Sequence, residues 1–219
     1  MDIVDVGGKL ALFYVPFLFA LCFHEFAHGQ VAKWRGDNTA ERLGRLTMNP
    51  LAHMDLVGTF LLPVGAIVFG IPIFFGWAKP VPVDSRNLKN VRSDMFWIAL
   101  AGPLSNVLLA VVATAFMFFA YRYQILGSYA RPVHALLEMF VLTNLFLAIF
   151  NLLPLHPLDG GKVLARFLPA SINYKLEQNQ QMTGLILLVL MMTGFLSVLR
   201  IPVMFIFNQL MAFANGGVS

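Results

Sequence analysis

The sequence predicts an all-α polytopic membrane protein with five or six transmembrane helices, a re-entrant hairpin and short β elements near the cytoplasmic face. Three observations lead to this fold class. Of the 219 residues, 58% are hydrophobic and 12% are charged, against about 25% charged in an ordinary soluble domain. Several apolar segments are long enough to cross the hydrocarbon core of a bilayer. Basic, turn-rich stretches separate them, as is typical of loops beside anionic lipid.

The charge pattern gives no sign of nucleic-acid binding, and the cysteine content excludes sites built from several cysteines. The net charge of +4 does not indicate binding to nucleic acid, because the basic residues lie between apolar runs. The single cysteine, Cys22, excludes an intrachain disulfide and a cysteine-based metal site, and we expect it to pack in the core. We therefore expect one membrane-embedded domain over residues 1–219, with a core over about 6–170 and accessory helices over about 182–214.

The first half of the chain carries two apolar segments of different character. The first, from about Val6 to Trp34, has a lipid-like front half and ionisable side chains in its back half. In the polar stretch that follows, Arg45–Met48 is expected to form a short strand. The second apolar segment, Leu56–Trp77, is interrupted by six Gly or Pro residues. Such breaks are compatible with backbone that enters the membrane and returns where protein covers it.

The second half is predicted to begin with two uninterrupted spanning helices. Met95–Tyr121 has no charged residue over 27 positions, and about 20 apolar residues suffice to cross the hydrocarbon. Pro132–Leu153 is the second. Near the end of the chain, Met182–Leu199 is long enough to cross. Ile201–Ala214 is short for a span and is expected to be a tilted or interfacial helix.

The back half of the first segment contains His24-Glu25-Phe26-Ala27-His28, which has the pattern H-E-x-x-H. On a helix, residues i and i+4 lie one turn apart on one face, so both imidazoles can bind one zinc ion. The glutamate beside them can reach a metal-bound water. The alternative is a polar cluster at the mouth of a helix, which is disfavoured because ionisable groups in an apolar segment are costly.

A catalytic zinc usually has a third protein ligand, and two acidic residues are candidates. Asp159 follows two prolines and stands directly before two glycines, at the end of another apolar segment. The prolines end the helix and the glycines allow the backbone to turn, so that a carboxylate could point inward. The alternative role for Asp159 is a helix cap at the membrane surface. Glu138 is a weaker candidate and is better explained as an interfacial charge.

Three motifs in this order resemble the site-2 protease family of intramembrane zinc metalloproteases: His24-Glu25-x-x-His28, Ala101-Gly102-Pro103-Leu104, and Asn151-x-x-Pro154-x-x-Pro157-Leu158-Asp159-Gly160. The stretches 44–50 and 76–82 are similar to a compact prokaryotic subgroup without a PDZ or CBS domain. The resemblance implies that His24, His28 and Asp159 bind one zinc ion and that Glu25 is the catalytic base. It also implies that Asn151 helps to hold the substrate or the oxyanion.

The topology follows from the requirement that the proposed ligands meet. The segments that carry the histidines and Asp159 must run in the same direction, so only one of the two apolar segments between them can cross. The unbroken Met95–Tyr121 must cross, which makes Leu56–Trp77 the re-entrant hairpin. This arrangement places 11 Lys and Arg residues on one side and 4 on the other, whereas crossing by every segment gives 7 and 8. Only the hairpin arrangement satisfies the positive-inside rule.

The expected function is an intramembrane zinc metalloendopeptidase that hydrolyses peptide bonds in or near transmembrane segments of membrane proteins. The site should lie toward the cytoplasmic side of the plasma or inner membrane. A helical substrate must be unwound before attack, and Arg45–Met48 or the hairpin could hold it extended. Two alternatives remain: an inactive or non-proteolytic zinc-binding membrane protein such as a transporter, and a zinc hydrolase of a non-peptide substrate. A transporter would usually have further acidic or His residues along its path.

For several other polar residues, the sequence allows either a structural or a functional role. His53 and Asp55 could lie at the mouth of the site or form an interfacial pair. His156 could support the metal ligands or be a loop side chain, and His134 is expected at the interface. Asn106, in the middle of an apolar segment, is expected to join helices or to touch the substrate.

Overall fold

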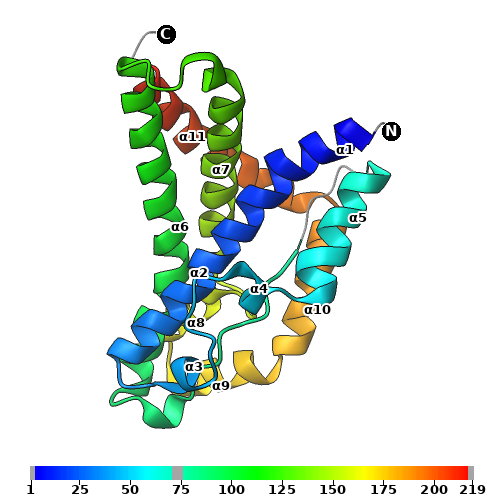
Figure 1. The fold of residues 1–219 in the computed structure, drawn as a ribbon. Helices are drawn as coiled ribbons and strands as arrows, with labels where there is room; N and C mark the ends of the chain where they lie inside the picture. Colours follow the sequence, from blue (N-terminus) through cyan, green and yellow to red (C-terminus); the bar gives the residue numbers. More distant parts are fainter. Residues whose placement is uncertain (1–2, 71–75, 217–219) are drawn as a thin grey trace.

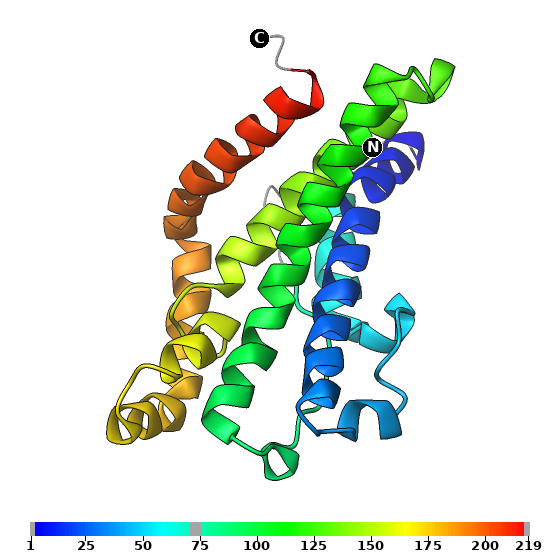
Figure 2. The ribbon, with the colours of Figure 1, turned by 90° about the vertical axis from the view of Figure 1, so that its left-hand side faces the viewer.

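The structure is a computed structural model that describes residues 3–70 and 76–216. Helices and loops make up these residues, and the all-α class is confirmed. Three long helices form the bundle that positions the site: α2 (Val15–Trp34), α6 (Val91–Arg122) and α7 (Ala130–Asn151). α2 packs against α6, and α6 packs against α7 (Figure 1). α2 and α7 run in the same direction and α6 runs opposite to them, as ligand convergence requires (Figures 1 and 2).

In the described part of the chain, four helices are long and apolar enough to cross a membrane: Val4–Trp34, Val91–Arg122, Gly127–Asn151 and Ser197–Ala214. This confirms a multi-pass membrane protein, with fewer long spans than the five or six expected. The first of them contains α1 (Ile3–Lys9), the π-helical η1 (Leu10–Tyr14) and α2. The third contains η4 (Gly127–Tyr129) and α7.

The bundle is held together by apolar side chains that α6, α7 and α11 (Arg200–Ala214) share. Alanines at several of these positions let the helix backbones approach closely, which is the usual basis of helix packing in a membrane. The buried residues of this cluster are Ala110, Ala113, Met117, Val141, Leu145, Val203 and Ala214.

The prediction of one spanning helix over Met182–Leu199 is wrong. α10 (Gln180–Met192) ends before Gly194, whose φ of 71° is left-handed and cannot continue a helix. After η5 (Phe195–Leu199), α11 runs toward the end of the bundle at which α6 also ends (Figure 2). The segment expected to be a short tilted or interfacial helix thus belongs to a helix long enough to cross.

The prediction of a short strand at Arg45–Met48 is also wrong, because Arg45 is irregular and the three residues after it form bends. The neighbouring extended segment, residues 78–84, contains Pro80 and Pro82, which have no N–H groups for a strand ladder. The Arg45 guanidinium instead donates to the carbonyl oxygens of Lys79 and Pro80, at 2.8 and 3.3 Å. A side chain thus replaces the backbone pairing of a sheet.

The second apolar segment forms a short helical piece, η2 (Leu56–Leu61) followed by α5 (Leu62–Phe69). The beginning of this piece is joined to the chain that follows it by hydrogen bonds. The Trp77 N–H donates to the Gly58 carbonyl at 3.2 Å, and the Thr59 hydroxyl donates to the Trp77 carbonyl at 2.7 Å. Residues 71–75, which the sequence analysis included in the hairpin, lie outside the described residues. The segment therefore leaves and rejoins the bundle at one place.

Buried Asp37 fixes the extended segment beside α2. It lies between α2 and α3 (Thr39–Arg42) and is fully buried. Burial alone would raise the pKa of its carboxyl, but hydrogen bonds from Thr39, Asn87 and the backbone N–H of Asp84 lower it. The extended segment leads into the short helix η3 (Ser85–Asn87) and is thereby anchored at that end. The other short helix, α4 (Pro50–His53), precedes η2.

Candidate metal centre

α2 presents His24 and His28 on one face, one turn apart. The helix begins at Val15, with Pro16 in its first turn, where the missing N–H costs nothing. Both imidazoles are buried, with 4% and 9% of each residue exposed. Their ring centroids lie 4.6 Å apart and their planes are 84° to one another. The local spacing of the motif therefore produces the pair of convergent nitrogens that the sequence predicted.

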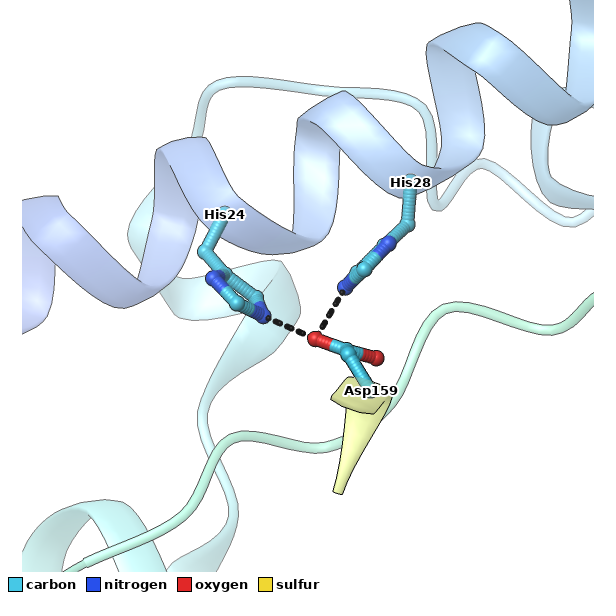
Figure 3. A group of neighbouring side chains, drawn as sticks. All are labelled: His24, His28 and Asp159. Carbon is cyan, nitrogen blue, oxygen red and sulfur yellow. Dashed lines mark hydrogen bonds and ion pairs between the residues drawn. The ribbon is translucent and has the colours of Figure 1, made fainter. Parts of the chain in front are cut away.

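Asp159 comes to this pair from the other side of the site, at the first residue of α8 (Asp159–Ala165). Its Oδ2 lies 3.0 Å from Nε2 of His24 and 3.2 Å from Nε2 of His28 (Figure 3). The next residue must be glycine, because a Cβ at Gly160 would overlap the carbonyl oxygens of Leu152 and Leu153. This close approach of the loop to the end of α7 turns the carboxylate toward the histidines.

The distances from Asp159 to the two histidines are compatible with a zinc site. In a tetrahedral site with bonds of about 2.0–2.1 Å, ligand atoms lie roughly 3.3 Å apart, which is close to the two observed separations. The three side chains are all buried, and their ligand atoms lie within 4.8 Å of one another. Burial opposes ionisation of Asp159, but the adjacent imidazoles outweigh it and hold the pKa of its carboxyl well below the usual value. A carboxylate that binds a metal must be ionised.

Each histidine uses its other ring nitrogen to contact α6. Nδ1 of His28 donates to the carbonyl oxygen of Ile98 at 2.6 Å, which leaves Nε2 as the lone-pair nitrogen. Nδ1 of His24 lies 2.6 Å from Oδ1 of Asn106. Such outer partners orient the ligands of a metal site. The position of Asn106 in an apolar segment predicts a contact between helices or with the substrate. The sequence does not indicate that its partner is His24.

Glu25 is held by the extended segment, through a contact for which the sequence contains no signal. Its Oε2 accepts a hydrogen bond of 2.7 Å from the backbone N–H of Val81. Val81 stands between Pro80 and Pro82, so it provides the only N–H of the three. The carboxylate is half-buried beside the two histidines on α2. The segment thus fixes the orientation of Glu25 through a single donor.

The remaining predicted site residue, Asn151, is the last residue of α7. Its amide nitrogen donates to the Leu147 carbonyl on its own helix at 2.9 Å. Glu138, the alternative third ligand, is exposed on α7 and is not part of the metal-binding group. Asp159 alone of the two candidates joins the histidines.

The other polar residues singled out in the sequence have structural contacts. Nε2 of buried His53 donates to the Thr47 carbonyl at 2.8 Å, and Asp55 caps η2 through the N–H groups of Val57 and Gly58. Cys22 is buried, as expected.

His156 is buried in the loop that leads to α8, and burial lowers the pKa of its imidazole. His134 lies half-buried near the start of α7.

Comparison with known proteins supports the chemistry of this site. The model of peptidase family M50 matches residues 12–131 and 127–194. "Putative zinc metalloprotease YwhC" of Bacillus subtilis (strain 168) is 34% identical, covering 82% of this chain and 79% of the relative. "Putative zinc metalloprotease Rip2" of Mycolicibacterium smegmatis is 31% identical, covering 85% and 68%. "Putative zinc metalloprotease MJ0611" of Methanocaldococcus jannaschii is 47% identical, covering 65% and 63%.

No solved structure matches the chain. The names of the three relatives all contain the words "putative zinc metalloprotease", and the buried His-His-Asp group suits that ion. On the family match and this similarity, the chain belongs to peptidase family M50, the site-2 family of membrane zinc metalloproteases.

Proposed function

We propose that the protein is an intramembrane zinc metalloendopeptidase that cleaves peptide bonds in or near transmembrane segments of membrane protein substrates. His24, His28 and Asp159 are its zinc ligands, Glu25 is its general base, and Asn151 contacts the substrate or the oxyanion. The observation that carries this proposal is the convergence of three buried ligand atoms from α2 and α8. Buried ionisable groups at the ends of apolar helices are costly unless they serve a function.

The side chains divide the chemistry of peptide hydrolysis between them. Zinc held by His24, His28 and Asp159 would supply a Lewis acid for the scissile carbonyl and for a water molecule. Oε2 of Glu25 is engaged by Val81, which leaves Oε1 to take the proton of the attacking water. Glu25 then gives this proton to the nitrogen of the leaving amine. The Asn151 amide can exchange its bond to Leu147 for one to the substrate.

The first test removes the metal. Incubating the purified protein with single-span peptides should give cleavage that a zinc chelator abolishes and added zinc restores. His24→Ala and Asp159→Ala should both lose stoichiometric zinc, because two remaining ligands hold the ion poorly. Metal content is measured on protein that elutes as a single species.

The outcomes separate the alternatives. Zinc binding without cleavage of any peptide would favour a non-proteolytic zinc-binding protein. An Asp159→Ala variant that keeps zinc with wild-type affinity would refute the ligand set.

We also propose that the apolar segment before Trp77 is re-entrant and that the site faces the cytoplasm from the plasma or inner membrane. The joined ends of the segment support this, since a crossing would separate them by the thickness of the bilayer. The basic residues then gather on the cytoplasmic side.

The topology can be tested at Arg86, whose side chain is 87% exposed. In an Arg86→Cys variant, a membrane-impermeant thiol reagent should label inverted vesicles and not intact cells. Cys22 is buried and provides a low background. Labelling from the outside only would show that the segment crosses.

A further inference from the structure

Two asparagine side chains form a hydrogen-bonded relay behind His24. Asn106 on α6 and Asn144 on α7 are both fully buried, with 0% of each residue exposed. Buried amides surrounded by apolar helices are costly unless their donors and acceptors are paired. These two meet that requirement through bonds to each other, to the backbone of α2 and α7, and to the imidazole of His24. The relay therefore joins three helices behind one proposed zinc ligand.

The direction of every bond in the relay follows from the backbone carbonyls at its ends. The Phe140 carbonyl oxygen can only accept, so Nδ2 of Asn144 faces it, at 2.8 Å. Oδ1 of Asn144 is then left to accept from Nδ2 of Asn106, at 2.9 Å. Nδ2 of Asn106 also donates to the carbonyl of Ala20, at 3.2 Å. Both hydrogens of the Asn106 amide are thus used.

Oδ1 of Asn106 consequently faces Nδ1 of His24, at 2.6 Å. An amide oxygen can only accept, so Nδ1 of His24 must carry a hydrogen. In the neutral ring, Nε2 then has the free lone pair and faces Asp159. The opposite tautomer would require Asn106 to turn over. Its oxygen would then meet two other oxygens, and leaving buried hydrogen bonds unmade is costly.

We propose that Asn106, oriented by Asn144, is a positioning residue that selects the tautomer and ring orientation of His24 for metal binding. This rests on the proposed role of His24 as a zinc ligand. An amide suits the position because it provides an acceptor without placing another charge in the membrane. His28 obtains the same tautomer more simply, from the Ile98 carbonyl. For His24, Asn106 provides the acceptor, and it lies on the same helix, α6, as Ile98.

The first measurement uses the unaltered, zinc-free protein with ¹⁵N-labelled histidine, assigned by a His24→Gln variant. The ¹⁵N chemical shifts of His24 should show the hydrogen on Nδ1. A hydrogen found on Nε2 and not on Nδ1 would overturn the inference. This readout does not require any relay variant to fold.

The second measurement compares zinc affinities by competition with a chelator. Asn106→Leu should bind zinc about 10–100-fold more weakly, the usual effect of removing a partner of a ligating histidine. Asn106→Asp, which retains an acceptor for Nδ1 but turns its second oxygen toward the acceptors of Ala20 and Asn144, should recover part of the affinity. Asn144→Leu should weaken binding less than Asn106→Leu, because Asn106 keeps its bond to Ala20. The control is Thr114→Val, which removes a buried hydroxyl bonded to Ala110 on the same helix.

The cobalt-substituted proteins give a spectroscopic check, since ligand-field bands report the geometry of the histidine ligands. Asn106→Leu should shift these bands, and Thr114→Val should leave them unchanged. Equal zinc affinity in Asn106→Leu and the wild type would overturn the inference and leave the proposed function intact. Absence of zinc from the wild type would instead refute the proposed function itself.

Discussion

Replacing Glu25 with glutamine is expected to reduce peptide cleavage by at least about 10²–10⁴-fold, the usual contribution of a general base, while zinc stays bound. Glutamine has nearly the same shape, and its amide oxygen can still accept the N–H of Val81. It cannot take a proton from water, however. Glu25→Gln therefore removes proton transfer while keeping the hydrogen bond to the extended segment. Cleavage of a single-span peptide and zinc content should be measured on the same preparation.

The matched control for this variant is Glu41→Gln. Glu41 is a surface carboxylate paired with Lys33 at 2.6 Å, and exposed pairs of this kind contribute little to stability. The Glu41→Gln protein should cleave the peptide at the wild-type rate. A Glu25→Gln protein with full activity would refute the assignment of the base, and one that has lost its zinc would show that Glu25 supports the metal directly.

Replacing Gly102 with alanine should weaken zinc binding and cleavage together, by about 10²-fold or more, which is the scale of a misplacement of about 1 Å in an active site. Gly102 lies on α6 where its backbone passes the two imidazoles. An added methyl group would overlap Nε2 of His28 and lie 2.6 Å from Nε2 of His24. These are the nitrogens proposed to bind zinc. The methyl group would therefore occupy the metal position or push the imidazoles away from it.

The change at Gly102 also overpacks the contact between α2 and α6, so folding must be assessed separately. Overpacking typically costs about 1–3 kcal/mol, which should lower the melting temperature without abolishing the folded state. Gly184→Ala on α10 is the control, because no atom lies within 4 Å of the added methyl group. A folded Gly102→Ala protein with wild-type zinc affinity would contradict the arrangement of α6 against the imidazoles.

The sequence was sufficient for those features that depend on composition or on short spacings. Composition identified a membrane protein, and the 3.6-residue period of the helix placed His24 and His28 on one face. The prolines and glycines around Asp159 indicated where a carboxylate could turn inward. Errors arose where a neighbouring segment or the backbone conformation of one glycine decided the outcome. Arg45–Met48 had strand-like residues but lies beside a segment with two prolines, and Met182–Leu199 is interrupted where Gly194 adopts a left-handed conformation.

The tertiary structure alone decided which groups surround the metal-binding side chains. The Val81 N–H lies 56 residues from Glu25, the Ile98 carbonyl 70 residues from His28, and the Asn106 amide 82 residues from His24. Each contact depends on how α6 or the extended segment is rotated and packed against α2. Spacing along one helix follows from backbone geometry common to all helices. The meeting of two helices depends on the packing of many side chains at once, which no single motif encodes.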